Sequence, residues 1–409
     1  MDQTMAAEGV PPRGRGFGLI GAVCGAHFFS HVHMLALPPL LPLLHKELGV
    51  SYSMLAALMI MFNLVSAATQ VPAGMIIDRI GAPRLLVAAL VVQSLAFIAI
   101  GSFGSYWGIM AFMALVGLGN AVFHPADYAI LSHEVRQEVL GRAFSFHTLS
   151  GFAGSALAPG LMVSLALAFD WRTAFHILGI VGLVGAAVVA FGLMRFGRGR
   201  SITARAKDNG ARPLTLGQMM TRKPILLAFL FWVLIAVAQD GISYFSVAAF
   251  DILHGLPLVS ANMVLTSFLV GTAAGIFIGG IISDRTPRHV RIVAVAMGVS
   301  GLLVIGVSFM TLPLPVLMAA FAVTGICWGM AMPSRDLIVR AITPEGSAGS
   351  VFGFVSTGFN VGSMIGPLLF GLLLDHRMGQ GVFLTSGMLM LLTVATLVSI
   401  RPATRRAGT

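Results

Sequence analysis

Five titratable side chains stand at helical spacing inside apolar stretches of the first 150 residues. His27 and His31 are four residues apart, so a helix would place them on one face. His124 and Asp127 are three apart in a later stretch, and His147 lies in the next one. An imidazole titrates near pH 6.5, so it can take up and release a proton at physiological pH. We therefore predict that these five residues bind substrate or carry a coupling proton.

Histidines spaced in this way can also bind a metal ion. The sequence His27-x-x-x-His31 has the spacing of zinc ligands on a helix. No carboxylate or thiolate of the right kind accompanies this pair, so we expect neither a metal site nor a cofactor. The two cysteines, Cys24 and Cys327, lie in apolar stretches and are expected to be packing residues.

Polar side chains also interrupt the other apolar stretches. Such groups are costly in hydrocarbon and usually face the interior of a helix bundle. Serine, asparagine and glutamine can instead simply bond a neighbouring helix, and both roles remain open here. The further candidates for substrate binding or coupling are Asn63, Asn120, Gln239, Asp240, Arg335 and Asn360.

Arg335 differs from the other basic residues because it lies well inside an apolar stretch, in Pro333-Ser334-Arg335-Asp336. A guanidinium matches a carboxylate or phosphonate as a two-pronged donor, so Arg335 can bind an anionic substrate. It can equally close a gate with Asp127, which stands at a related place in an earlier stretch. A third interpretation is a simple pair with its neighbour Asp336.

The elements that must position these residues follow from composition. The chain of 409 residues is 57% apolar and 10% charged, with a mean hydropathy of +0.92. A soluble domain has about 25% charged residues, whereas here apolar runs of about 20 residues recur, the length that crosses a bilayer. Membrane-spanning β-strands would alternate over about ten residues, so helices remain. We predict an all-α membrane protein with twelve transmembrane helices at 17–44, 52–77, 85–103, 107–131, 141–168, 174–194, 224–249, 258–282, 290–310, 316–339, 350–374 and 381–400.

The twelve spans form two related sets of six. We assign 1–194 to an N-terminal half, 195–223 to a central loop and 224–409 to a C-terminal half. The string Gly74–Arg79 returns as Gly280–Arg285, 206 residues later. Pairs separated by 208 residues are Gly117 and Gly325, Gly141 and Gly349, Gly154 and Gly362, and Pro159 and Pro367. Duplicated halves with a site between them are how many secondary transporters are built.

The distribution of charge orients this bundle. Most of the 25 lysine and arginine residues fall in segments on the side of the termini and the central loop. Cytoplasmic loops carry such an excess, so we place both termini and the central loop in the cytoplasm, with the chain in the inner membrane. The same placement explains the net charge of +10 without nucleic-acid binding. The chain has no glycine-rich phosphate loop and no loop long enough for a catalytic domain, so we expect no enzyme and no ATP-driven pump.

The string Gly74-x-x-x-Asp78-Arg79-x-Gly81-x-x-Arg84 is similar to the signature loop of the major facilitator superfamily. The degenerate copy with Asp284 and Arg285 stands where that family repeats it. The resemblance implies two pseudo-symmetric six-helix halves and alternating access. It also implies a conformational lock, in which Asp78 accepts from the free N–H groups at the start of span 350–374, and Asp284 meets the start of span 141–168. The implied lock residues are Gly74, Asp78, Arg79, Gly81, Arg84, Asp284 and Arg285.

A narrower resemblance concerns one branch of that family. The strings Leu37-Pro38-Pro39-Leu40 and Phe123-His124-Pro125-Ala126, with the histidines of the first helix, resemble the fosmidomycin-resistance branch. Gly151-x-x-Gly154 is similar to the glycine-rich fifth-helix motif of antiporters. That motif is only partial here, because Ala158-Pro159 replaces its Gly-Pro pair, and the fourth-helix arginine of proton antiporters is absent.

We therefore expect a proton-coupled secondary transporter of a small organic solute, working by symport or antiport. Arg335 and the histidines favour an anionic solute. The alternative is drug or antibiotic efflux by proton antiport, which the branch resemblance favours. A membrane sensor built on a transporter body is the rival class. The expected partners are the solute, protons and the lipid bilayer, and the expected state is a monomer.

The topology can be tested with a reporter enzyme fused at Gly210, in the central loop. Because that loop holds many of the basic residues, the reporter is expected to behave as cytoplasmic. The same reporter fused at Arg172, in a short connection on the opposite side, is the control and should behave as periplasmic. A periplasmic signal from Gly210 would overturn the orientation.

Overall fold

The computed structural model describes residues 13–196, 215–344 and 347–399, and these are helical with no strand among them. The helices are α1 (Arg13–Met34), η1 (Pro38–Leu40), α2 (Leu41–Leu48), α3 (Tyr52–Ile80), α4 (Ala82–Phe103), α5 (Tyr106–Glu134), α6 (Gln137–Ala168), α7 (Trp171–Phe196), α8 (Leu216–Thr221), α9 (Lys223–Asp240), η2 (Gly241–Phe245), α10 (Ser246–His254), α11 (Leu258–Arg285), α12 (His289–Ser308), α13 (Leu314–Ile342), α14 (Ala348–Asp375) and α15 (Gly379–Val398).

Twelve segments of the described chain are long and apolar enough to cross a membrane, which confirms the predicted fold. The first span was predicted as one helix over 17–44, and this is wrong in detail. Helix α1 ends at Met34, and the 3₁₀ turn η1 separates it from α2. The reason is the pair Pro38 and Pro39, since proline lacks the backbone N–H that continues an α-helix.

The central segment also differs from the prediction of a loop over 195–223. Helix α7 continues to Phe196, and α8 occupies Leu216–Thr221. Thr215 begins α8 with a capping box, in which its side chain accepts from the backbone of Gln218 and the Gln218 side chain accepts in return. Residues 197–214, including Gly210, lie outside the described residues, so the orientation of this loop stays a prediction.

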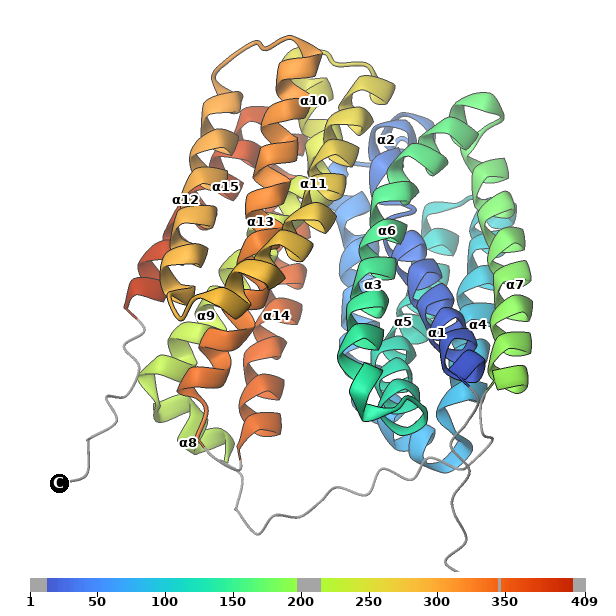
Figure 1. Cartoon of the computed structure of the whole chain (residues 1–409). Coiled ribbons are helices and arrows are strands. Elements are labelled where there is room, and N and C mark those ends of the chain that lie inside the picture. Colours follow the sequence, from blue (N-terminus) through green and yellow to red (C-terminus); the bar gives the residue numbers. More distant parts are fainter. Residues whose placement is uncertain (1–12, 197–214, 345–346, 400–409) are drawn as a thin grey trace, which may run out of the picture.

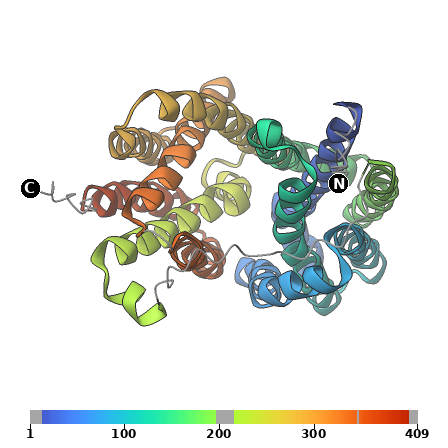
Figure 2. The same ribbon diagram turned by 60° about the horizontal axis from the view of Figure 1, so that its bottom comes forward.

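The helices form two groups, α1–α7 and α9–α15, which lie side by side in Figures 1 and 2. The internal repeat extends to how helices pack within each group. A Cβ on Gly117 of α5 would collide with the carbonyl oxygen of Phe62 on α3. A Cβ on Gly325 of α13 would collide with that of Phe268 on α11. Both glycines therefore let two backbones approach closely, which is the usual way that membrane helices pack.

The two groups meet at the end that carries α2 and α10, and they lie apart at the end that carries α8 (Figure 1). At the meeting end, the backbone N–H of Tyr52 donates to Asp375 Oδ1 at 2.6 Å, and that of Ser53 donates to Asp375 Oδ2 at 3.1 Å. These are free donors in the first turn of α3, where helix geometry favours an anion. A further bond runs from Asn63 Nδ2 to the carbonyl of Ser363, at 3.1 Å. Asp375 at the end of α14 thus joins one half to the other.

We expect Asp375→Asn to weaken this contact, because a carboxamide has one accepting oxygen and no charge. Hydrogen bonds to charged groups contribute about 1.5–3 kcal/mol, so losing one should raise the population separated at this end by roughly ten-fold. Distances between spin labels at Glu47 and Met378 would measure the fraction of molecules in which the halves are separated at this end. Asp170→Asn is the control, since the Asp170 side chain bonds nearby residues of its own half, among them Thr173. An unchanged distance distribution in Asp375→Asn would show that other contacts hold the halves together.

Candidate functional site

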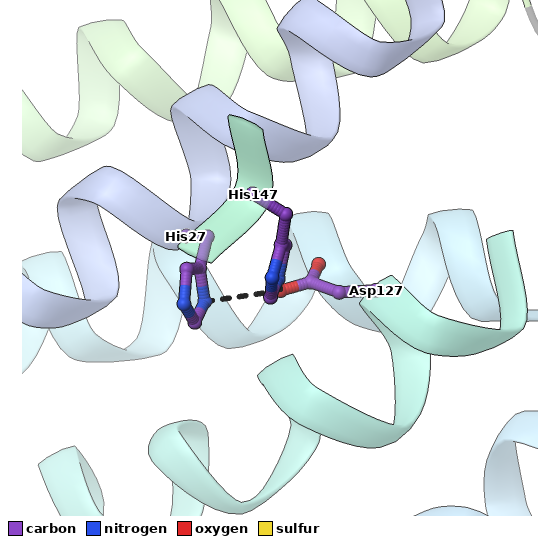
Figure 3. A group of neighbouring side chains, drawn as sticks. All are labelled: His27, Asp127 and His147. Atoms are coloured by element: carbon purple, nitrogen blue, oxygen red, sulfur yellow. Dashed lines mark hydrogen bonds and ion pairs between the residues drawn. The ribbon is translucent and has the colours of Figure 1, made fainter. Parts of the chain in front are cut away.

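Three of the predicted residues meet between α1, α5 and α6. His147 Nε2 lies 2.9 Å from Asp127 Oδ2, and His27 Nδ1 lies 3.3 Å from the same oxygen. The three side chains point toward one another in Figure 3. They are 3%, 0% and 1% exposed for His27, Asp127 and His147, so the carboxylate has imidazoles rather than water beside it. We call these three residues the histidine–aspartate cluster.

The other two predicted histidines flank this cluster. The His31 ring centroid lies 4.6 Å from that of His27, and His31 Nδ1 lies 2.9 Å from Ser155 Oγ. The His124 ring centroid lies 5.2 Å from that of His27 and 6.4 Å from that of His147, and His124 is exposed. His124 is the histidine of this group that reaches the surface of the protein.

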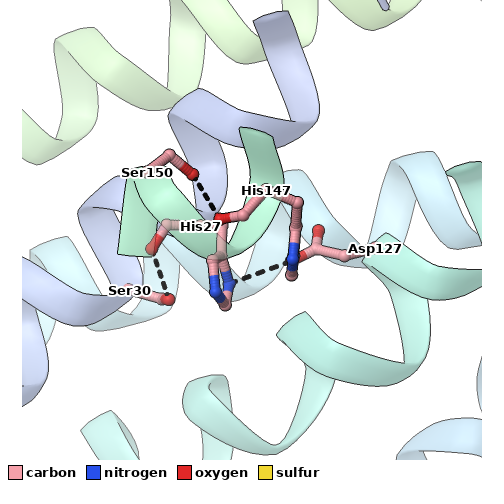
Figure 4. Close-up of polar contacts among 5 residues, drawn as sticks. All are labelled: His27, Ser30, Asp127, His147 and Ser150. Carbon is pink, nitrogen blue, oxygen red and sulfur yellow. Dashed lines mark hydrogen bonds and ion pairs between the residues drawn. The ribbon is translucent and has the colours of Figure 1, made fainter. Parts of the chain in front are cut away.

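Hydroxyl groups hold the backbone on both sides of the cluster rather than its rings. Ser30 Oγ donates to the carbonyl of His27 at 2.8 Å, and Ser150 Oγ donates to that of His147 at 2.7 Å (Figure 4). The rings of His27 and His147 stack, with centroids 3.7 Å apart. Among the described contacts no hydroxyl bonds an imidazole nitrogen of these two residues. His147 Nε2 is hydrogen-bonded to Asp127, whereas His27 Nδ1 lies near the carboxylate without a hydrogen bond.

A buried carboxylate needs a proton or a positive partner, because hydrocarbon does not solvate its charge. The histidine–aspartate cluster can supply either, by placing a proton on an imidazole or on Asp127 itself. The ligand atoms of the three residues also lie within 4.8 Å of one another, close enough to hold a metal ion. No carboxylate stands near His27 and His31 in the sequence, but in the structure Asp127 of α5 supplies one beside His27.

The glycine motif of the fifth span explains why α6 lies so close to these rings. A Cβ on Gly151 would lie 2.7 Å from His27 Nε2 and 2.9 Å from His31 Nε2. A Cβ on Gly154, one turn on, would collide with the carbonyl oxygen of Phe28. These glycines therefore leave room for the two imidazoles between α1 and α6.

In the C-terminal half, Arg335 lies between α13 and α9. Its Nε lies 2.9 Å from Asp336 Oδ1, and its Cζ lies 3.9 Å from the ring centroid of Trp232. Of the three roles open to Arg335, the neighbour pair is formed here. Asp127 bonds the histidines instead, so the gate between Asp127 and Arg335 is not formed in this structure.

The remaining candidates in the spans divide by surroundings. Asn63 bonds across the two halves, and Asn120 Nδ2 donates to Ser66 Oγ at 3.0 Å, so both bond neighbouring helices. Asp240 is buried where α9 gives way to the π-helix η2, beside Ser363 of α14. Gln239 and Asn360 are half-buried on α9 and α14. The structure does not bring these five side chains into the histidine–aspartate cluster.

The implied lock residues lie at the end where the halves are apart. Gly74 is in the last two turns of α3, and Gly81 connects α3 to α4 with a φ of 98°, a conformation that suits glycine. The side chains of Arg79, Arg84, Asp284 and Arg285 are exposed, and the Asp78 side chain lies outside the described residues. The lock therefore stays a prediction.

The sequence and the arrangement of helices match known proteins. The family model described as "Major Facilitator Superfamily" matches residues 23–263 and 234–409. The chain belongs to the major facilitator superfamily.

Several relatives span nearly the whole transporter. It is 24% identical to the "Probable sulfoacetate transporter" of Cupriavidus necator, over 95% of this chain and 96% of the relative. It is 25% identical to the "Fosmidomycin resistance protein" of Escherichia coli, over 93% and 92%. A bacterial homologue of the human lysosomal transporter Spinster, solved inward-facing and unoccupied, has the same fold, with a TM-score of 0.73, 15% identity and 96% of both chains covered. The family and branch resemblances are confirmed.

Sequence reasoning missed two residues of this transporter, Trp232 and Asp375. Trp232 lies in the stretch before Gln239 and Asp240 and has no polar neighbour in sequence that marks it. Asp375 follows an apolar span, where a charged residue is ordinary. A signal existed for Asp375, because an acid at a helix end can accept from the N-terminus of another helix, as expected of Asp78.

The two glycines of α6 give a matched stability test. We expect Gly154→Ala to lower the melting temperature of the purified protein, because the new methyl meets backbone; overpacking costs about 1–3 kcal/mol. Gly151→Ala should lower the melting temperature less, because its new methyl group meets the outer atoms of the His27 and His31 rings rather than backbone. Gly160→Ala on the same helix is the control, as it has open space around it. Equal melting temperatures for Gly154→Ala and Gly160→Ala would contradict this packing.

Proposed function

We propose that this protein moves small organic anions across the inner membrane by alternating access, coupled to protons. The observation that carries the proposal is a pair of ionisable sites at equivalent places in the two halves. Asp127 and Arg335 are 208 residues apart, the offset of the internal repeat in these helices. The imidazoles around Asp127 can take up and release a proton. The guanidinium of Arg335 can bind an anion.

An anionic substrate is supported by chemistry and by resemblance. An arginine inside a membrane-spanning helix is costly unless it pairs or serves a substrate. The relative named for sulfoacetate acts, by its name, on a molecule with both a carboxylate and a sulfonate. The resistance protein matches the chain about as well, at 25% against 24% identity, and it is the intramembrane Arg335 that favours an organic anion over antibiotic efflux.

Proton coupling follows from the net charge of the histidine–aspartate cluster. With one proton shared between Asp127 and His147, and with His27 neutral, the cluster is neutral overall. Without that proton it carries one negative charge that must stay buried as the halves move, which is unfavourable in hydrocarbon. The proton therefore permits the change of state that moves the substrate.

The same charges suggest the direction in which this structure is open. With the central loop and both termini in the cytoplasm, the end where the halves lie apart is the cytoplasmic end (Figure 1). The contact of Asp375 with Tyr52 and Ser53 then closes the opposite end. Exposed His124 would exchange protons with the cytoplasm in this state. The working unit is a monomer in the lipid bilayer.

The test is uptake of organic acids, including sulfoacetate, into proteoliposomes with and without a pH gradient. We expect uptake by the wild type to depend on pH, because protonation of the histidine–aspartate cluster changes the charge that stays buried as the halves move. His124→Gln and His147→Gln keep hydrogen bonding but cannot titrate. Both should lose accumulation driven by the pH gradient while exchange of substrate for substrate continues.

His33→Gln is the matched control on α1. His33 is buried like His27, but its Nδ1 lies 3.0 Å from Gln93 Oε1 on α4, away from Asp127. This variant should keep gradient-driven accumulation. If His124→Gln and His147→Gln both accumulate substrate as well as the wild type does, the histidines do not couple transport. If no organic acid is transported, the proposed substrate class is wrong.

A further inference from the structure

Trp232 of α9 and Arg335 of α13 form a compact pair in the C-terminal half. The Arg335 Cζ lies 3.9 Å from the centre of the Trp232 ring, so the guanidinium rests on the indole face. Trp232 in turn meets the ring of Phe359 on α14 edge to face, with centroids 6.4 Å apart. Three helices therefore fix the position of the indole. The indole in turn holds the guanidinium against its face, because a cation is attracted to an aromatic ring.

The pair has hydrogen-bond donors to spare. A guanidinium carries five N–H donors and no acceptor. Arg335 uses Nε on Asp336 Oδ1, and among the described residues its two terminal nitrogens have no acceptor within bonding distance. The Trp232 Nε1 is buried and also lacks a partner there. A buried donor left without an acceptor is unfavourable, so the indole N–H of Trp232 calls for an acceptor, and the terminal nitrogens of Arg335 are free to donate to the same group.

We propose that Trp232 and Arg335 together bind the acidic group of the transported anion. The terminal nitrogens of Arg335 donate to one oxygen, and the indole N–H of Trp232 donates to another. This selects an acidic group with at least two oxygens on one atom, namely a carboxylate, a sulfonate or a phosphonate. Trp232 is both a binding residue and a positioning residue for Arg335. The inference rests on the proposed transport of organic anions and adds the atoms that recognise them.

Asp336 fits this arrangement as the group that orients the guanidinium. Its side chain is 49% exposed, whereas the Arg335 side chain is 13% exposed. The bond to Nε occupies one edge of the guanidinium and leaves the terminal nitrogens for an anion. Asp336 therefore orients Arg335 without filling the position of the substrate.

The test measures KM and kcat for uptake of a panel of acids, with sulfoacetate among them, in variants of the pair. Trp232→Phe keeps an aromatic face under Arg335 and removes the indole N–H. We expect it to raise KM by about ten-fold, the typical effect of losing a hydrogen bond to a charged group, with kcat little changed. Trp232→Leu removes the face as well and should raise KM further, and Arg335→Gln should abolish uptake.

Trp328→Phe is the matched control. Trp328 lies on α13, is buried, and has an Nε1 without a partner among the described residues, but it packs against Phe268 rather than an arginine. Its substitution should leave KM unchanged. Melting temperatures of both phenylalanine variants separate lost folding from lost binding, and Trp232→Phe remains informative should Trp232→Leu fail to fold.

Each outcome decides a different question. A raised KM in Trp232→Phe, with normal KM in Trp328→Phe, supports the two-residue anion site. Wild-type KM in Trp232→Phe, with uptake lost in Arg335→Gln, overturns the role of Trp232 and leaves anion transport standing. An equal rise of KM in both phenylalanine variants makes Trp232 a packing residue and overturns the inference. Failure of the wild type to transport any acid overturns the proposed function and the inference with it.

Discussion

The structure depends on one constraint: an ionised side chain inside the bilayer must find its counter-charge or its hydrogen bonds within the helix bundle. Asp127 meets this with two imidazoles, at 2.9 Å and 3.3 Å. Arg335 meets it with the carboxylate of Asp336 and the face of Trp232. The packing serves these contacts, since Gly151 leaves the space that His27 and His31 occupy.

The internal repeat places Asp127 and Arg335 in equivalent places in the two halves. The close approach of α5 to α3, through Gly117, returns as the approach of α13 to α11, through Gly325. On this shared framework the fourth span of one half carries an acid, and that of the other half carries a base, at Asp127 and Arg335. The internal repeat thus places side chains of opposite charge at two equivalent positions.

Much of the fold could be predicted from the sequence, because burial in lipid makes hydropathy a direct measure of the spans. The nearness of His27 and His31 could also be predicted, since residues four apart share one face of a helix. The break at Pro38 was visible as two prolines, yet the apolar run continued through it. Contacts between helices could not be read in this way. The side chain that contacts Arg335 from another helix is Trp232. Nothing in the sequence around Trp232 marks it as a partner, because only the packing of α9 on α13 brings the two residues together.

The first helix of each half is interrupted, and the two interruptions touch, since η1 contacts η2. One is a tight 3₁₀ turn of three residues that begins with Pro38, and the other a wide π-turn of five residues that follows Asp240. An unbroken ladder of hydrogen bonds makes a helix stiff, and sharp bends occur where that ladder is disturbed. The two sites at which these helices can bend most easily therefore lie together, near the end of the bundle where Asp375 joins the halves. Motion of the halves can bend these two helices there while the segments that carry His27 and Trp232 stay straight.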